Sequence, residues 1–198
     1  MLNQPFEVDK VSGQEFVIAL AGNPNVGKST VFNSLTGLKQ HTGNWPGKTV
    51  MKAQGRHRHK DKEFIIVDLP GTYSLMANSE EEEIARDFMC FGEPDVTVVV
   101  TDATCLERNL NLVLQTLEIR ENVVVCVNLI DEAKRKEINI NLKELSNQLG
   151  VPVVGTNARN NKGLGKLMDA VYLVATREII NNPIRLMYDT EIEEQIGQ

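Results

Sequence analysis

The chain has 198 residues, of which 41% are hydrophobic and 24% are charged, and its formal net charge is −6. This composition is typical of one soluble globular domain, and the acidic balance argues against a general nucleic-acid-binding surface. Cys90, Cys105 and Cys126 are odd in number and form no CxxC pair, so we expect free thiols in the core rather than disulfides or a zinc site. No signal peptide opens the chain and no apolar run is long enough to span a membrane, which predicts a cytosolic chain.

Short β-branched runs alternate with helical patterns along most of the chain, after a polar arm over residues 1–15. Strands are predicted at residues 16–21, 49–57, 63–68, 95–101, 122–127 and 151–154. Helices are predicted from the glycine-rich turn to residue 35 and at residues 79–91, 106–117, 142–149 and 164–175. A capping box, Ser79 with Glu82, marks the start of the second helix. This alternation predicts an α/β fold with a mostly parallel six-stranded sheet and helices on both faces.

The pattern breaks near the end of the chain, at Asn181-Asn182-Pro183. We therefore predict one domain over residues 16–180. Residues 181–198 look like the start of a following helical domain that is truncated here.

Residues 22–29 read GNPNVGKS, which matches GxxxxGK[ST] between a predicted strand and a predicted helix. Gly22 and Gly27 allow a tight turn in which backbone N–H groups converge on phosphate oxygens. Lys28 places a cation at the β and γ phosphates, and the Ser29 hydroxyl can bind Mg²⁺. This segment predicts a nucleotide-phosphate site formed by Gly22, Asn23, Asn25, Val26, Gly27, Lys28, Ser29 and Thr30.

Two further motifs stand at the ends of predicted strands. In DLPG, residues 68–71, Asp68 can hold Mg²⁺ through a water and the Gly71 amide can bond the γ-phosphate. In NLID, residues 128–131, the Asp131 carboxylate can accept the two N–H donors on one edge of guanine, a pair that adenine lacks. Asn128 can tie this loop to the phosphate loop, and Leu129 stands where many GTPases carry a lysine that covers the base.

The order and spacing of these motifs resemble the Ras-like P-loop GTPase superfamily, and within it the Era and TrmE branch. The resemblance implies that Thr156, Asn157 and Ala158 form the loop that meets guanine O6. It also implies that HTGNWPGKTV, residues 41–50, is switch I, a glycine-rich loop in which no core strand is expected. Thr49 is then the switch threonine, and Mg²⁺ is held by Ser29, Thr49 and Asp68.

Three stretches narrow the resemblance to the G domain of the ferrous iron transport protein B family: GNPNVGKSTVFNSLTG, GNWPGKTV and DLPGTYSL. It covers residues 16–178, and DTEIEEQI near the end resembles the helical domain that follows in that family. The family implies GTP binding and hydrolysis that regulate ferrous iron uptake. The fragment itself would be soluble, at the cytoplasmic face of the inner membrane, with the transmembrane part of the same transporter as its partner. No oligomeric state is indicated.

The expected hydrolysis is slow, because Thr72 stands where Ras-like enzymes carry a water-orienting glutamine. The resemblance implies a substitute, a potassium ion held by Asn25 and by the carbonyls of Gly43 and Trp45, with the Trp45 side chain packed over the nucleotide. The alternative is that Asn25 only shapes the phosphate loop and Trp45 only docks a mobile loop. The residues assigned to catalysis are Asn25, Lys28, Thr49 and Gly71.

Two other functions remain open from the sequence. An Era-like GTPase of RNA or ribosome assembly would be expected to carry a basic appendage, whereas residues 179–198 are acidic, and no nucleic-acid partner is expected. A P-loop ATPase or kinase would have no use for NLID. His41, His57 and His59 are expected to be plain surface residues, since an HxH pair on an exposed hairpin makes a poor ferrous site.

Overall fold

The computed structural model describes residues 8, 15–37, 40–76 and 78–185. A seven-stranded sheet in the order β2-β3-β4-β1-β5-β6-β7 forms its centre. The strands are β1 (Glu15–Gly22), β2 (Gln40–Asn44), β3 (Met51–His59), β4 (Lys62–Asp68), β5 (Val96–Asp102), β6 (Val123–Asn128) and β7 (Val153–Gly155). β2, β3 and β4 pair in antiparallel fashion, and every other pairing is parallel.

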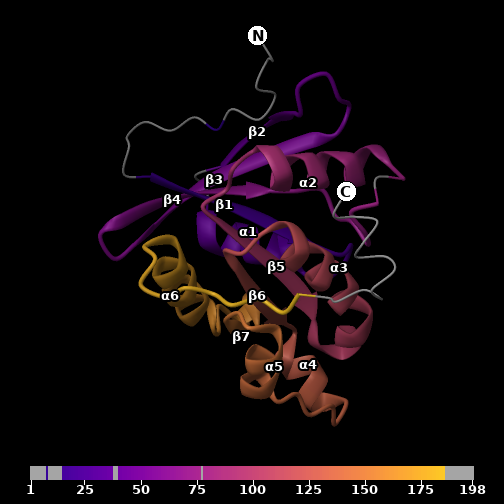
Figure 1. The fold of residues 1–198 in the computed structure, drawn as a ribbon, viewed down its shortest axis with the longest axis vertical. Coiled ribbons are helices and arrows are strands. Elements are labelled where there is room, and N and C mark those ends of the chain that lie inside the picture. Colours follow the sequence, from indigo (N-terminus) through magenta and orange to yellow (C-terminus); the bar gives the residue numbers. More distant parts are fainter. Residues whose placement is uncertain (1–7, 9–14, 38–39, 77, 186–198) are drawn as a thin grey trace, which may run out of the picture.

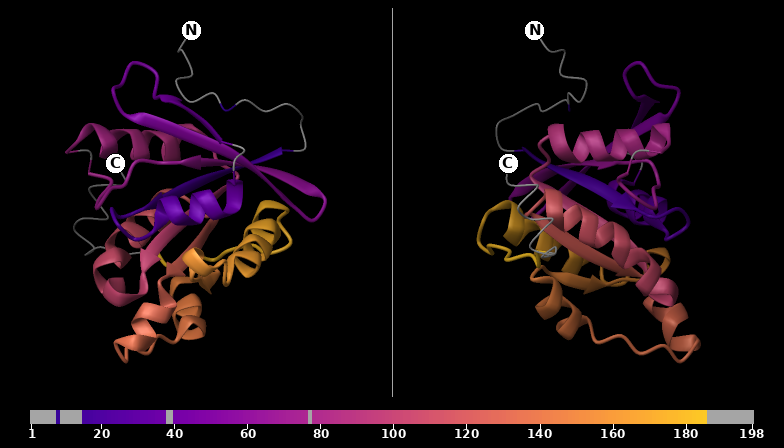
Figure 2. Two further views of the ribbon diagram at one scale, coloured as in Figure 1. Left: turned by 180° about the vertical axis from the view of Figure 1, so that it is seen from behind. Right: turned by 45° about the vertical axis from the view of Figure 1, so that its right-hand side comes forward.

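Six α-helices surround this sheet in the described part of the chain (Figure 1). They are α1 (Lys28–Thr36), α2 (Glu80–Phe91), α3 (Leu106–Ile119), α4 (Ile130–Arg135), α5 (Leu142–Leu149) and α6 (Leu164–Ala175). α1 and α6 cover one face, which Figure 2 brings forward in its left panel. α2 and α3 cover the other face, with α4 and α5 beside β6 and β7. The predicted α/β fold is therefore confirmed.

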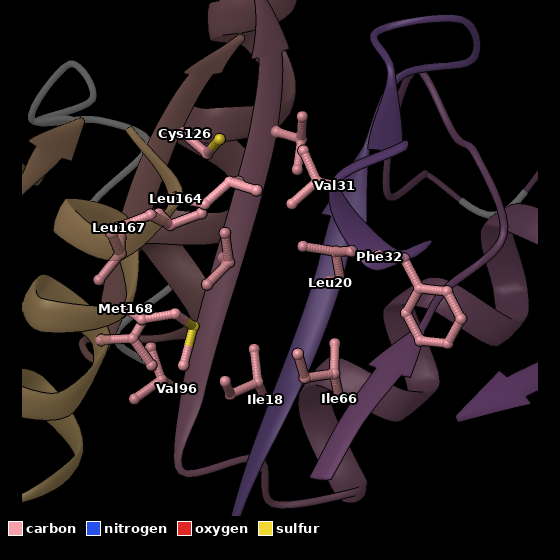
Figure 3. Close-up of a cluster of buried hydrophobic side chains, with 14 of the residues drawn as sticks. Ile18, Leu20, Val31, Phe32, Ile66, Val96, Cys126, Leu164, Leu167 and Met168 are labelled. Atoms are coloured by element: carbon pink, nitrogen blue, oxygen red, sulfur yellow. The ribbon is translucent and has the colours of Figure 1, made fainter. Parts of the chain in front are cut away.

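Side chains of β1 alternate between the two faces, as a pleated strand requires. Ile18 and Leu20 pack with α1 and α6 in the cluster of Figure 3, whereas Val17 and Ala19 pack toward α2. Both layers are apolar because a parallel sheet is covered on both sides. β1 lies between β4 and β5. The sheet therefore grows from β1 toward one side with β4, β3 and β2 and toward the other side with β5, β6 and β7. Such a switch point is where α/β sheets bind ligands.

The sheet has seven strands rather than the predicted six, because part of the expected switch I loop is a strand. β2 pairs with β3 from Gln40 opposite Gly55 to Asn44 opposite Met51. Its described side chains are exposed and polar, so backbone hydrogen bonds hold it at the sheet edge without an apolar pattern. Trp45, directly after it, is only 2% exposed. This stretch therefore contains no core strand, as expected, since β2 is an exposed edge strand, but the Trp45 side chain belongs to the core.

The predicted N-terminal arm and the predicted C-terminal segment are described only in part. β1 begins at Glu15, one residue inside the predicted arm, of which Val8 is otherwise the only described residue. At the other end, Asn182 N–H donates to the Gly150 carbonyl and Ile184 N–H donates to the Leu149 carbonyl. The boundary at residue 180 and the truncated helical domain remain predictions, since most of the latter lies outside the described residues.

Candidate nucleotide-binding site

The polar motifs meet at one edge of the sheet because they end parallel strands. Gly22 ends β1, Asp68 ends β4 and Asn128 ends β6. Parallel strands carry their carboxyl ends to the same edge, where side chains far apart in sequence come into contact. One such contact joins Lys28 to Asp68 and another joins Asn128 to Val26.

The phosphate loop opens directly into α1. Asn25 has φ 66° and Gly27 has φ 82°, both in the left-handed region. A Cβ atom at Gly27 would lie 2.4 Å from the Asn128 amide nitrogen, so the position also needs glycine for space. Gly27 gives α1 no side-chain cap. The first N–H groups of the helix are therefore available to an anion, and the helix dipole favours one there.

Lys28 reaches across the loop to the end of β4. Its Nζ lies 2.5 Å from Asp68 Oδ1 and 2.5 Å from the Leu69 carbonyl oxygen, and the residue is only 9% exposed. Burial raises the pKa of Asp68, although Lys28 opposes this effect. A cation and a carboxylate that is only 15% exposed thus stand beside the uncapped helix start. This combination fits a phosphate chain together with Mg²⁺, which binds oxygen ligands and often keeps part of its water shell.

The raised pKa of Asp68 predicts a pH effect on stability. Protonation of this carboxyl stabilises the nucleotide-free fold, fully below its ordinary pKa of 3.8, and that stabilisation is lost as the pH rises through the raised pKa. We therefore expect the unfolding free energy of the wild type to fall relative to that of Asp68→Asn as the pH rises from about 3.8 toward neutral. Urea unfolding over this pH range measures the difference. The prediction is contradicted if the difference in unfolding free energy between the wild type and Asp68→Asn changes with pH no more than the difference between the wild type and the exposed Glu81→Gln variant.

Asn128 connects three parts of the site, and its predicted tie to the phosphate loop is one of these contacts. Its Nδ2 donates to the Val26 carbonyl of the phosphate loop at 3.1 Å. Its Oδ1 accepts hydrogen bonds from the Thr156 hydroxyl and from the Ala158 amide, both at 3.1 Å. The Ala158 amide was predicted to meet guanine O6 and here donates to Asn128 instead. The predicted base loop, in which Asn157 is also buried, is therefore held against the phosphate loop.

Asp131, three residues after Asn128, has one carboxylate oxygen without a hydrogen-bond donor in the described part of the chain. Its Oδ1 is shielded from solvent and accepts no hydrogen bond from any residue that the structure describes. Its Oδ2 lies 4.0 Å from Nη2 of Arg135. A buried acceptor without a donor is costly, and a ligand edge with N–H groups would satisfy it. Leu129 before it has φ 62°, a left-handed conformation that costs a leucine about 1–2 kcal/mol and turns the chain into α4.

Two side chains that the sequence analysis did not single out as site residues support the base loop. Ser34 of α1 donates to the Ala158 carbonyl at 3.1 Å, and the Cys126 sulfur lies 3.2 Å from the Thr156 hydroxyl oxygen. A serine inside a helix and a cysteine inside an apolar strand carry no local pattern that announces these contacts. Only the packing of α1 and β6 around the loop reveals them.

The cysteines differ in environment, which gives a chemical test. Cys126 is buried as expected, and burial raises its pKa to about 12, whereas Cys105 is exposed and Cys90 is intermediate. The expectation that Cys105 lies in the core is wrong, because it precedes α3 on the surface. An alkylating reagent at pH 8 should therefore modify Cys105 first and leave Cys126 unmodified. Peptide mass spectrometry measures this, with the urea-unfolded chain as control; equal rates at both thiols would contradict it.

The predicted switch I, residues 41–50, contacts α2 in this structure. The Thr49 hydroxyl donates to Glu80 Oε2 of α2 at 3.1 Å. Trp45 packs edge-on against Phe88 of α2, with ring centroids 5.5 Å apart, so its side chain sits in the core and not over a nucleotide. Gly43 lies in β2 opposite Lys52, and the Trp45 carbonyl accepts the Lys48 N–H.

The segment that follows Asp68 lies against the phosphate loop. Gly71 lies against Pro24 of the phosphate loop, since a Cβ there would be 3.3 Å from Pro24 Cα. Thr72 is buried, and its hydroxyl donates to the Ser74 carbonyl at 2.5 Å. Ser79 caps α2 as predicted by accepting the Glu82 N–H, while Glu82 accepts the N–H of Asn78 rather than that of Ser79.

The histidines of the β3–β4 hairpin form structural contacts. His57 Nδ1 lies 2.8 Å from the Leu35 carbonyl oxygen, and His59 Nε2 lies 2.9 Å from Asp169 Oδ1. They dock the hairpin on α1 and α6, so they are more than plain surface residues, while His41 is exposed. Within the described residues, no group of three or more His, Cys, Asp or Glu side chains could hold a metal ion. None of the described helices is both long and apolar enough to cross a membrane.

Comparison with known proteins identifies a matching family. Residues 16–171 match the family model described as ferrous iron transport protein B. A fusion protein of Fe(2+) transport protein A and Fe(2+) transporter FeoB from Porphyromonas gingivalis is 40% identical over 189 residues, 94% of this chain and 22% of that protein. Fe(2+) transporter FeoB from Salmonella typhimurium is 38% identical over 179 residues, 88% of this chain and 23% of that protein. The chain thus spans less than a quarter of the length of these relatives.

Solved structures show the same fold. The G domain of the FeoB iron transporter from T. maritima has a TM-score of 0.78 at 42% identity, covering 81% of this chain and 99% of that one. The cytosolic domain of the same transporter in a GDP form has a TM-score of 0.88 at 40% identity, covering 92% of this chain and 72% of that one.

Proposed function

The chain belongs to the ferrous iron transport protein B family and has the fold of its G domain, and we propose that it is a GTP-binding and GTP-hydrolysing switch domain that regulates ferrous iron uptake by a membrane transporter. The observation that carries the choice of nucleotide is Asp131, whose Oδ1 has no hydrogen-bond donor among the described residues, on a side chain that is 44% exposed. Guanine offers two N–H donors to such a carboxylate, and adenine would leave it unpaired. A related cytosolic domain has been solved in a GDP form.

The phosphates would lie on the start of α1. Lys28 would exchange its contacts with Asp68 and Leu69 for the β and γ phosphates. Ser29, Thr49 and Asp68 would hold Mg²⁺, which, when bound, neutralises charge on the phosphates. The Asp68 carboxylate is free to take this role once Lys28 moves, and the Gly71 amide next to Pro24 would bond the γ-phosphate.

Slow intrinsic hydrolysis follows from the position of Thr72. Its side chain is buried and its hydroxyl is engaged by the Ser74 carbonyl, so it has no free group with which to orient an attacking water. Ras-like enzymes use a longer glutamine for this task. The rate enhancement would then come from positioning and charge, supplied by Lys28 and the start of α1.

A potassium ion held by Asn25 and by the Gly43 and Trp45 carbonyls would supply additional charge. Asparagine tolerates the left-handed conformation that Asn25 adopts. The need for this backbone conformation could therefore explain the asparagine without any role for its side chain. Asn25→Gly separates the two explanations, because glycine keeps this backbone and removes the side chain.

The test is steady-state GTP hydrolysis in KCl and in NaCl at matched ionic strength, with ATP as the control nucleotide. We expect turnover in KCl to exceed that in NaCl by at least about ten-fold, a modest effect for one charge placed at a phosphoryl transition state. Asn25→Gly should lose most of this difference and keep GDP binding. Equal rates in both salts would refute the potassium role, and hydrolysis of ATP as fast as GTP would refute the guanine site.

Regulation of iron uptake would be a property of the full-length protein, of which this chain would be one part. The two relatives compared above are Fe(2+) transporters about four times as long as this chain, which favours a transporter over a factor in RNA or ribosome assembly. The transmembrane part of the same transporter would be the partner, and the domain would lie at the cytoplasmic face of the membrane. Iron uptake by cells carrying Asp131→Asn in the full-length protein tests this, with uptake unchanged as the contradicting result.

A further inference from the structure

The loop between β2 and β3 is fastened to the start of α2, beside which it lies in Figures 1 and 2. Lys48 Nζ lies 2.8 Å from Glu83 Oε2 and 4.0 Å from Glu80 Oε1. The neighbouring Thr49 hydroxyl donates to Glu80 Oε2 at 3.1 Å. Two consecutive loop residues are thus bound by two carboxylates one turn apart on a helix.

The base of this loop is fastened to the same helix. The Trp45 N–H donates to the Val50 carbonyl and the Lys48 N–H donates to the Trp45 carbonyl, each at 3.0 Å, which closes the loop. The Trp45 ring packs against Phe88, two turns along α2 from Glu80. The apolar base and the charged tip therefore hold the loop on α2 together.

This position conflicts with the role of Thr49 in the proposed function. To meet Mg²⁺ and the γ-phosphate, the Thr49 hydroxyl must join Ser29 and Asp68 at the sheet edge, which requires that it leave Glu80. The side chain of Lys48 must give up or stretch its pair with Glu83 at the same time, because the two residues are adjacent. The contacts on α2 and the contacts with a γ-phosphate are alternatives.

We propose that Lys48, Glu80 and Glu83 form a latch that holds the switch threonine on α2 and thereby favours the nucleotide-free and GDP-bound chain over the GTP-bound chain. Lys48 acts through Thr49 and is a positioning residue. This inference rests on the proposed function and adds a regulation of the same site.

The latch is suited to opening because it is partly exposed. The side chains of Lys48 and Glu83 are 32% and 43% exposed, so water and salt weaken their attraction. The hydrogen bond between them raises the pKa of Lys48 and lowers that of Glu83, so it favours the charged form of each. Acidic residues also stabilise the first turn of any helix, so the test must separate the latch from that general effect.

The experiment compares Lys48→Met and Glu83→Gln with two controls. Lys48→Arg keeps the charge, and Glu81→Gln removes a carboxylate from the same helix turn at an exposed position. Affinities for GDP and for a non-hydrolysable β,γ-imido GTP analogue are measured in Mg²⁺, and their ratio is the readout. We expect Lys48→Met and Glu83→Gln to raise the preference for the GTP analogue about three- to five-fold, the upper part of the range of a partly exposed ion pair. Both controls should stay within about two-fold of the wild type.

A second readout needs no nucleotide. Hydrogen exchange of the Lys48 amide, which bonds the Trp45 carbonyl, should be faster in Lys48→Met than in the wild type and Lys48→Arg. High salt should move the wild-type affinity ratio toward that of Lys48→Met.

An unchanged ratio in Lys48→Met and Glu83→Gln, or an equal shift in Glu81→Gln, would overturn the latch while leaving GTP binding intact. Failure of the wild type to bind either nucleotide would instead overturn the proposed function and, with it, the regulatory role of the latch. In that case, hydrogen exchange of the Lys48 amide still shows whether Lys48 and Glu83 hold the loop on α2.

Discussion

Asp131→Asn should weaken GTP binding by a factor on the order of 10² to 10⁴. Each hydrogen bond to a charged group contributes about 1.5–3 kcal/mol, and the carboxylate is proposed to accept two from guanine. Xanthine carries an oxygen where guanine carries the 2-amino group, so an asparagine amide can donate to it. The variant should therefore prefer XTP to GTP, and equilibrium binding of both nucleotides measures the change.

Glu132→Gln is the matched control for this prediction. Glu132 lies next to Asp131 at the start of α4 and also faces Arg135, at 3.4 Å. Loss of its carboxylate should leave GTP affinity within about two-fold of the wild type, since half-exposed ion pairs contribute little. Wild-type GTP affinity in Asp131→Asn, or an equal loss in both variants, would mean that Asp131 does not read the base.

Lys28→Met should lower kcat/KM for GTP hydrolysis by about 10²- to 10³-fold. The proposed role of Lys28 is to place a cation where charge develops on the γ-phosphate, and one such group typically contributes this much. Removal of the ammonium also leaves Asp68 without its 2.5 Å partner, so the nucleotide-free chain should lose about 1–3 kcal/mol of stability. Steady-state hydrolysis and urea unfolding measure the two effects separately.

The exposed Lys166 of α6 provides the control, because Lys166→Met removes the same charge from an exposed position outside the phosphate loop. It should change neither the rate nor the stability appreciably. Hydrolysis in Lys28→Met at more than a tenth of the wild-type rate would contradict the assignment of Lys28 to the phosphates, provided that the variant is folded at the temperature of the assay.

The main architecture and the positions of the motifs could be predicted from the amino-acid sequence alone. β-branched runs such as residues 96–100 and 123–127 form the buried strands they predict, because a parallel sheet covered on both faces needs apolar side chains throughout. GNPNVGKS, DLPG and NLID stand at the carboxyl ends of β1, β4 and β6, as their flanking patterns indicate. Ser79 caps α2 because capping depends on residues three positions apart. These features are local, so a single sequence contains them.

Other features were decided only when distant segments came together. β2 exists because its backbone groups bond to β3, and backbone hydrogen bonds leave no mark on side-chain pattern. Trp45 looks like part of a mobile loop until Phe88 and its neighbours on α2 provide a core for it. The same holds for Cys105, whose exposure follows from where α3 begins.

The arrangement of the site also came from tertiary structure. Asn128 meets Val26 across 102 residues, and Lys28 meets Asp68 across 40. Thr49 lies on Glu80 because α2 offers a carboxylate within reach of its hydroxyl. The sequence can name the residues of a switch, but the position of the switch depends on the relative strength of contacts between segments that only folding brings side by side.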